Sequence, residues 1–325
     1  MSRELVIGID IGGTGTGIGW VDSSGKIILT DDIPTQDYAD PKLFVDAVAG
    51  KIRKQNSTLP SGTHIAGIGI GAPNGNYFNG TIEFAPNLRW KGIVPLAQLF
   101  SDALGAPTVV TNDAKAAALG ELYFGGAKGM KDFIFITLGT GLGSGIVSNG
   151  QLIYGHDGFA GELGHTIIIQ HGRQCGCGRR GCLEQYCSAT GIVKTYLEIL
   201  RSGDPDSSRN VKLEQVDGKY IYDRAMSGDE NAFYAFNYTG ELLGFALANS
   251  VAYTRPEAIF LFGGLAEAGE LLFNPTCISF EKNLLQIYKN KIKILPSSLP
   301  ENDAALLGAA SLIWNELSQH KSTTV

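Results

Sequence analysis

The chain has 325 residues, of which 44% are hydrophobic and 18% are charged, and its formal net charge is -6. This length exceeds the size at which a single hydrophobic core usually stops growing, so we expect two domains. The sequence contains no run of basic residues, which argues against DNA or RNA as a partner. No apolar stretch approaches the roughly 20 residues that cross a bilayer, and Asp10 interrupts the first hydrophobic segment. We therefore predict neither a membrane partner nor a signal peptide.

Cysteine usage indicates the compartment. The chain has 5 cysteines, and most of them lie close together within residues 175–187. An odd total, with four of the cysteines crowded into one segment, is less typical of a disulfide framework than of a metal site in a reducing environment. We therefore predict a cytoplasmic protein.

Strands and helices alternate in the first part of the chain. Residues 4–11 are apolar and β-branched, residues 12–17 are rich in glycine, and two short strands follow, which predicts a start built from hairpins. The next expected elements are a helix at 41–55, a strand at 65–70, a helix at 96–104, a strand at 108–111 and a helix that begins near Asn112 or Asp113. This order is typical of an α/β domain.

The second part of the chain repeats the opening pattern. Segments 9–15 and 136–141 each carry a strand end into a glycine turn, and each is followed by another strand and turn. Two related halves with duplicated sheets are the simplest interpretation. The further expected elements are a strand at 133–138, a polar surface excursion at 204–218, helices around 230–253, a strand at 259–262 and a C-terminal helix from about residue 302.

The predicted elements divide into two domains. We expect residues 1–113 and about 302–325 to form a smaller domain that the C-terminal helix closes. Residues 114–301 would form a larger domain that contains the cysteine-rich loop.

Three glycine turns follow predicted buried strands. Without a Cβ, the backbone N–H groups of such turns can approach phosphate oxygens closely, although a tight hairpin is the alternative interpretation. None matches the Walker A or the dinucleotide-binding pattern, which excludes the standard P-loop and Rossmann classes. Asp10 lies beside the first turn and could hold Mg²⁺, or it could stabilise the turn. The candidate phosphate-binding residues are Gly12, Gly13, Thr14, Gly139, Thr140, Gly141, Gly263 and Gly264.

One imidazole and three thiols have the composition of a closed zinc site. His165, Cys175, Cys177 and Cys182 would complete a tetrahedral shell with no open position, which is typical of structural zinc. The alternative is a set of free thiols in a glycine-rich loop. Cys187 and Cys277 are interpreted as ordinary small buried residues outside the site.

Polar residues flank the cysteine loop and the predicted helix start. Asn112 and Asp113 could be a helix N-cap, or Asp113 could accept a hydroxyl proton during phosphoryl transfer while Asn112 holds the substrate. Glu162, His165 and Glu184 surround the cysteines and could hydrogen-bond the hydroxyls of a sugar.

Seven motifs together resemble one known family. The chain is similar to sugar kinases of the ROK family (repressors, open reading frames and kinases), within the actin, hexokinase and Hsp70 superfamily. The resemblance extends from residue 7 to about residue 310. The motifs are DIGGT at 10–14, APNL at 85–88, NDA at 112–114, LGTGLG at 138–143, GELGH at 161–165, CGCGRRGCLE at 175–184 and FGG at 262–264.

This resemblance implies a fold, an activity and cofactors. The fold would be α/β, a two-domain actin-like ATPase (ribonuclease H-like) fold with duplicated mixed sheets and a cleft between domains. The activity would be transfer of the terminal phosphoryl group of ATP to the 6-hydroxyl of a free hexose, with glucose the best single candidate. ATP with Mg²⁺ and a structural Zn²⁺ would be the cofactors, and a homodimer or higher homo-oligomer is expected.

The resemblance also implies roles for individual residues. Asp113 would be the catalytic base, and the glycine turns would bind the nucleotide phosphates. Zinc would be held by the imidazole and three thiols named above, and His165 would serve both the metal and the sugar through its two nitrogens. The residues implied around the sugar are Asn87, Asn112, Asp113, Glu162, His165 and Glu184.

Two departures from the family pattern affect the substrate prediction. Gly15 stands where many members have Lys or Asn after DIGGT, which removes a side-chain contact to phosphate, and residues 77–80 add a short insertion near the sugar loop after residues 73–75. Mannose, fructose, allose or an N-acetylhexosamine therefore stay open as alternative substrates.

Other classes of function are also possible. A sugar-sensing ROK regulator would carry a helix-turn-helix domain before the first strand, and that strand is predicted to start at about Glu4, so we expect an enzyme. A general ATPase of the Hsp70 or actin type would not need the zinc loop. Polyphosphate-dependent glucokinases resemble the chain at residues 10–15 but generally lack the cysteine loop, so ATP is the expected donor.

Overall fold

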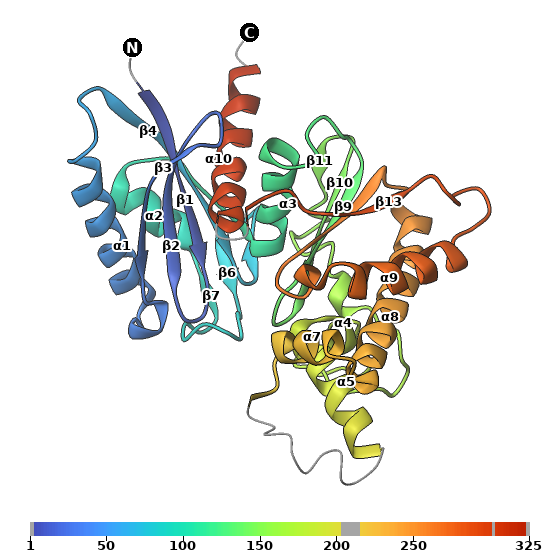
Figure 1. The fold of residues 1–325 in the computed structure, drawn as a ribbon. Helices are drawn as coiled ribbons and strands as arrows, with labels where there is room; N and C mark the ends of the chain where they lie inside the picture. The colour runs from blue at the N-terminus through green and yellow to red at the C-terminus, as the bar shows by residue number, and fades with distance from the viewer. Residues whose placement is uncertain (1–2, 203–214, 301–302, 323–325) are drawn as a thin grey trace. The chain divides into compact units, whose positions relative to one another are not determined.

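A computed structural model describes residues 3–202, 215–300 and 303–322 (Figure 1). Most of the polar excursion expected at 204–218 lies outside these ranges. No helix within them is long and apolar enough to cross a membrane.

The chain forms two compact units. Unit 1 contains Met1–Met130, Leu152–Gly161 and Ser298–Val325, and unit 2 contains Lys131–Gln151 and Glu162–Ser297. The expected boundary at residues 113/114 would separate the helix that starts at Asp113 from the first domain, but this helix belongs to unit 1 because it packs on the C-terminal helix.

Unit 1 is built on a five-stranded mixed sheet in the order β3-β2-β1-β4-β8. The first three strands pair antiparallel, whereas β4 and β8 join β1 in parallel. The strands are β1 (Arg3–Ile11), β2 (Thr16–Asp22), β3 (Ile27–Ile33), β4 (Thr63–Ala72) and β8 (Thr108–Asn112), and a small sheet adds β5 (Gly75–Asn76), β6 (Thr81–Glu83) and β7 (Ile93–Val94). The helices are α1 (Pro41–Asn56), α2 (Leu96–Leu104), α3 (Asp113–Phe124) and α10 (Ala304–Ser322), with a short 3-10 turn, η1 (Thr35–Asp37).

The two faces of this sheet are covered in different ways. On one face, apolar side chains of β1 such as Ile7 form a core with α1 and α2. On the other face, α10 lies directly on glycines: a Cβ at Gly69 would come within 1.9 Å of the Ala309 carbonyl oxygen, and one at Gly8 within 2.3 Å of the Leu306 carbonyl oxygen. Close contact between backbones thus accounts for some of the chain's 43 glycines.

Unit 2 has a second five-stranded sheet in the order β11-β10-β9-β12-β13. Its apolar strand residues form one core with the helices, and α8 and α9 pack closely against each other. The strands are β9 (Phe133–Leu138), β10 (Leu142–Ser148), β11 (Gln151–Leu152), β12 (Ala258–Phe262) and β13 (Lys293–Pro296). The helices are α4 (Glu184–Cys187), α5 (Ala189–Ser202), α7 (Gly218–Met226), α8 (Glu230–Thr254) and α9 (Glu270–Asn283), with 3-10 turns η2 (Leu163–His165) and η4 (Ala266–Ala268).

The two sheets share one topology. In each, an antiparallel hairpin, β1–β2 or β9–β10, is extended by a parallel strand, β4 or β12, on the other side of its first strand. This confirms the predicted duplication of mixed α/β sheets. The glycine turns that follow β1 and β9 therefore lie in equivalent hairpins.

Candidate functional site

The first glycine turn joins β1 to β2. It closes with a hydrogen bond from the Gly12 N–H to the Gly15 carbonyl at 2.9 Å. A Cβ at Gly13 would lie 2.5 Å from the Asn87 carbonyl oxygen, so the turn and the loop that carries Asn87 are in close contact within unit 1. The Asn87 residue itself is exposed and available to a ligand.

Asp10, at the end of β1, lies close to Asp113. A Cβ placed on Gly71 of β4 would be 3.8 Å from Asp10 Oδ1 and 3.6 Å from the Asp113 Cα. Burial, and secondly the Asp113 carboxylate, raises the pKa of Asp10 to about 7. Two close carboxylates, one of them largely buried, are a donor set that suits a hard cation such as Mg²⁺.

Asn112 and Asp113 form the start of α3. Asn112 Oδ1 accepts hydrogen bonds from the N–H groups of Ala114 at 3.0 Å and Lys115 at 3.3 Å, so Asn112 is a true N-cap. Asp113 Oδ1 accepts from Ala114 N–H at 2.8 Å, which fixes the carboxylate at the helix start.

Asp113 has the properties of a base. It is solvent-accessible but many protein atoms surround it, and the loss of hydration raises its pKa. Hydrogen bonds from Ala114, its own backbone N–H and Asn112, and the charge of Lys115, act against this increase. A carboxylate that is both accessible and more basic than usual can accept a hydroxyl proton.

The other glycine turns lie together at one edge of the unit 2 sheet. Gly139 follows β9 and Gly263 follows β12, which are parallel neighbours. Leu265 N–H donates to the Leu138 carbonyl at 3.2 Å, which ties the turn at Gly263 to the end of β9. The start of α5 holds the turn at Gly139, since Ala189 N–H donates to the Gly139 carbonyl at 2.8 Å.

Glu184 lies against the turn that follows β9. Its Oε2 accepts a hydrogen bond from Leu142 N–H at 3.2 Å, and a Cβ at Gly141 would be only 2.5 Å from the same oxygen. A predicted sugar residue and a predicted phosphate turn are therefore in contact within unit 2.

The four predicted zinc ligands come together in unit 2. The ligand atoms of His165, Cys175, Cys177 and Cys182 all lie within 4.8 Å of one another. Cys177 Sγ is 3.6 Å from Cys182 Sγ, and Cys175 Sγ is 3.7 Å from His165 Nδ1. Zinc–sulfur bonds of about 2.3 Å in a tetrahedron put two sulfurs about 3.7 Å apart, so the geometry suits Zn²⁺.

The three thiols of the loop differ in pKa: burial raises the pKa of Cys175 and Cys182, whereas the pKa of Cys177 shifts the other way. Although burial acts in the opposite direction, hydrogen bonds from Arg179 and the other cysteines lower the pKa of Cys177 to about 6. The thiolate, which is the ligand form, is thus favoured. Arg179 also donates to the His165 carbonyl at 2.8 Å, which holds two sides of the loop together. Cys187 and Cys277 lie outside this cluster.

Glu162 and His165 both belong to the segment around η2. Glu162 is exposed, and His165 is turned so that Nδ1 faces Cys175. The other ring nitrogen, Nε2, is then not needed for the metal.

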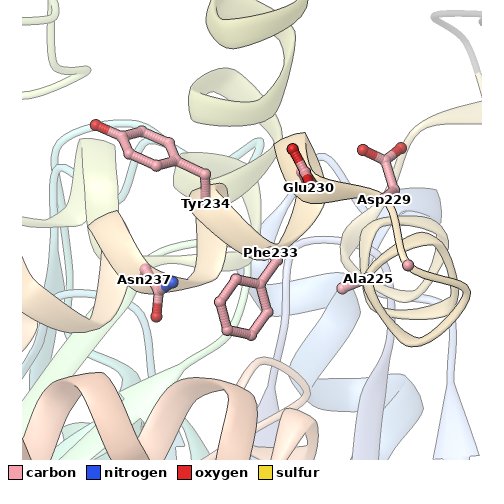
Figure 2. A pocket seen from close by; sticks show the side chains of 7 residues that line it. Ala225, Asp229, Glu230, Phe233, Tyr234 and Asn237 are labelled. Atoms are coloured by element: carbon pink, nitrogen blue, oxygen red, sulfur yellow. The ribbon is translucent and has the colours of Figure 1, made fainter.

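A surface pocket elsewhere in unit 2 contains none of the predicted site residues (Figure 2). It lies where α7 meets the start of α8, and Phe233 and Tyr234 point in different directions from consecutive positions. Asp229 in this pocket already caps α8 and pairs with Arg224 at 2.8 Å. The pocket therefore gives no reason to move the predicted site.

A comparison with known proteins identifies the family. The family model described as "ROK family" matches residues 6–316. The chain belongs to the ROK family. This confirms the resemblance found in the sequence motifs.

Curated ROK relatives include both enzymes and regulators. The glucokinase of Streptomyces coelicolor is 36% identical over 95% of this chain and 97% of its own length. The xylose repressor of Caldicellulosiruptor bescii is 30% identical over 96% of this chain but 78% of its own length. Either relative is sufficient to assign the chain to the ROK family. Because one is named a kinase and the other a repressor, the activity of this chain has to be inferred from its site.

Solved ROK structures share the fold. A ROK family glucokinase from Streptomyces griseus, in complex with glucose and AMPPNP, superposes with a TM-score of 0.78 at 34% identity and covers 95% of this chain and 98% of its own. The predicted actin-like two-domain fold is thereby confirmed.

Two buried polar residues of unit 1 were not predicted from the sequence. Lys115 follows the NDA motif, and Asn76 follows the sugar loop, and each is only 1% exposed. The sequence signal for a buried polar contact was the lysine within an alanine-rich helix, because a lysine is rarely buried unless a partner compensates its charge.

Proposed function

We propose that this ROK protein is an ATP-dependent hexokinase that phosphorylates the 6-hydroxyl of glucose. The observation that carries the proposal is Asp113, an accessible carboxylate of raised pKa fixed at a helix start beside Asp10. The glucokinase of S. coelicolor and the glucose-bound and AMPPNP-bound glucokinase of S. griseus support the substrate and the donor.

The proposed chemistry is direct transfer. Asp113 orients the 6-hydroxyl and accepts its proton, the hydroxyl oxygen forms a bond to the γ-phosphorus, and the bond from this phosphorus to the β,γ-bridging oxygen breaks. The products are hexose 6-phosphate and ADP. When bound, Mg²⁺ would supply neutralisation of phosphate charge, and Asp10 is the residue placed to hold it directly or through water.

The glycine turns are the proposed phosphate sites. Their backbone N–H groups can approach anionic oxygens without a Cβ in the way. Gly15 offers no side chain, so any phosphate contact at that position would come from its backbone alone. The proposed residues are Gly12, Gly13, Thr14, Gly139, Thr140, Gly141, Gly263 and Gly264.

Sugar recognition and zinc binding share one residue in this proposal. His165 would ligate Zn²⁺ through Nδ1 and donate or accept a sugar hydrogen bond through Nε2. The zinc would be structural, since its four protein ligands leave no open position. The proposed sugar-binding residues are Asn87, Asn112, Asp113, Glu162, His165 and Glu184.

The compartment, the domains and the oligomeric state of the enzyme are also proposals. Free thiolates that bind zinc require a reducing compartment, which supports the cytoplasm. We propose that units 1 and 2 are the two kinase domains and that the chain acts as a homodimer, without nucleic-acid or membrane partners. Sedimentation of the purified protein would measure the oligomeric state.

An ADP-release assay tests the activity. Purified protein is supplied with Mg-ATP and a panel of glucose, mannose, fructose, allose and N-acetylhexosamines, while its zinc content is measured. Rapid turnover on glucose is expected. Preference for another sugar would correct the substrate, and no turnover with ATP or polyphosphate, despite bound zinc, would favour a sugar-sensing role instead.

A further inference from the structure

One short segment of unit 1 connects two parts of unit 2. The chain leaves unit 2 after Gln151, contributes Leu152–Gly161 to unit 1, and returns to unit 2 at Glu162. Glu162 is four residues after Gly158, so its Cα can lie no more than about 14 Å from that of Gly158. Whatever fixes this segment therefore limits where Glu162 can be.

Lys115 holds the segment from the first turn of α3. Its side chain is buried, with 1% of the residue exposed, and Nζ donates a hydrogen bond to the Gly158 carbonyl at 3.0 Å. Burial of an ammonium group is unfavourable unless hydrogen bonds compensate for lost water, so this contact is not incidental. The buried helix residues around Lys115 are otherwise small and apolar: Ala114, Ala116, Ala117 and Ala118.

Asn76 holds the adjacent carbonyl from a different element. Its Nδ2 donates to the Asp157 carbonyl at 2.9 Å and to Glu83 Oε1 at 3.0 Å. Its Oδ1 accepts from Phe78 N–H at 3.0 Å, at the beginning of the inserted residues. Asn76 is also 1% exposed, so two buried polar side chains bind successive carbonyls of one segment.

The insertion at residues 77–80 adds a third contact. The ring of Tyr77 stacks on that of Tyr154 with 4.1 Å between centroids and 7° between planes. Such stacking stabilises the contact between the two segments beyond the effect of burying their apolar area. The insertion thus binds the N-terminal half of the segment, while Asn76 and Lys115 bind its C-terminal half.

We propose that Lys115 and Asn76 are positioning residues for sugar binding: they fix Leu152–Gly161 and thereby the following Glu162. This inference rests on the proposed role of Glu162 as a sugar ligand. Lys115 is two residues from Asp113, so one helical turn holds both the base and the anchor of the segment that precedes Glu162.

Kinetics of Lys115→Met test the proposal. The Met side chain has similar length and no donor, so the segment is released without a large cavity. We expect the KM for glucose to rise about 5- to 50-fold while the KM for ATP changes less than about 2-fold. Lys42→Met is the matched control, because Lys42 is also in the first turn of a unit 1 helix but is exposed. An unchanged glucose KM in Lys115→Met would overturn the proposal.

The second anchor supplies a test of shared action. Asn76→Ala should also raise the glucose KM, and the double variant should be little worse than the more affected single variant, since a segment already released cannot be released again. If the fold-increases in glucose KM of the two single variants multiply in the double variant, the two residues act independently and the proposal is overturned. If Lys115→Met fails to fold, Asn76→Ala carries the same test.

Hydrogen exchange separates this inference from the proposed function. Amides of residues 153–160 should exchange faster in Lys115→Met than in wild type or Lys42→Met, and unchanged exchange would overturn the anchoring itself. A wild type inactive on every hexose would instead overturn the proposed function and with it the role in sugar binding, while the exchange result would still decide the anchoring.

Discussion

The two equivalent hairpins carry different residues at the same strand position. Thr137 near the end of β9 corresponds to Asp10 in β1, and Thr137 Oγ1 accepts a hydrogen bond from Gly143 N–H at 3.1 Å, which stabilises its own hairpin. Asp10 instead lies beside a second carboxylate and has a raised pKa. The same sheet topology therefore carries a carboxylate with a raised pKa in unit 1 and a hydrogen-bonded hydroxyl in unit 2.

The comparison extends to what surrounds each turn. In unit 1 the turn contacts the Asn87 loop and lies in the same unit as the base, whereas in unit 2 the turn contacts Glu184, which adjoins the zinc loop. Asp113 thus belongs to unit 1 and the His165, Cys175, Cys177 and Cys182 cluster to unit 2, although the two units share one sheet topology.

Removal of the base in unit 1 should have the largest effect. Asp113→Asn keeps the size of the side chain but cannot accept the proton, so kcat should fall about 10²- to 10⁴-fold. Glucose binding, measured by calorimetry, should persist within a few-fold. Turnover near that of wild type would remove Asp113 from the role of base.

Loss of a zinc ligand should affect unit 2 through stability. Cys177→Ser opens the four-ligand site, so zinc content should fall below one per chain and unit 2 should unfold at a lower temperature. Zinc analysis and calorimetric melting measure both quantities, with Cys277→Ser as the control outside the cluster. A zinc-free variant with wild-type stability and activity would contradict the structural assignment.

A methyl group on the unit 2 turn should affect nucleotide binding. In Gly139→Ala the new Cβ would meet no atom within 4 Å, so the fold should be unchanged. The methyl group should nevertheless obstruct a phosphate that approaches the backbone, and we expect the KM for ATP to rise about 10-fold, or about 1.4 kcal/mol. The glucose KM serves as the internal reference, and an equal rise in both constants would argue against a specific phosphate contact.

Neutralisation of Asp10 should stabilise unit 1 in a pH-dependent way. Its folded-state pKa of about 7 is above the usual aspartate value of 3.8, so its contribution to stability is present below about pH 4 and is lost as pH rises to about 7. Asp10→Asn should therefore raise the Tm, measured without magnesium, by a few degrees at pH 8 and by less at pH 5.

Asp31 provides the control of opposite sign. The hydrogen bond from Lys51, at 2.8 Å, lowers the pKa of Asp31, so this carboxylate stabilises the fold at neutral pH. Asp31→Asn should leave the Tm at pH 8 unchanged or slightly lower. An increase in Tm for both variants would show that the effect of Asp10→Asn comes from net charge and not from its surroundings.

Local sequence patterns were sufficient for the hairpins and the ligand cluster. Glycine after a β-branched strand predicts a turn regardless of the rest of the fold, and closely spaced thiols cannot lie far apart. For Asn112 the N-cap interpretation is confirmed, and a hydrogen bond from its side chain also lowers the pKa of the Asp113 carboxylate, while its role in holding the sugar stays a prediction.

Contacts between distant segments could not be predicted in the same way. The sequence placed α3 after the domain boundary, and nothing in residues 152–161 indicates that they join unit 1. The partners of Lys115 and Tyr77 are 43 and 77 residues away, and periodicity reports only which face of an element is buried, not what covers it.

The helix α10 has a consequence for the order of folding during synthesis. Its residues, Ala304–Ser322, leave the ribosome after every other described element, yet they cover the glycine face of β1 and β4, which are among the first. Unit 2 has its complete sequence before then, so it can become stable while the part of the unit 1 sheet that α10 covers is still exposed. The glycine face of β1 and β4 is therefore among the last surfaces of the chain to be fully buried.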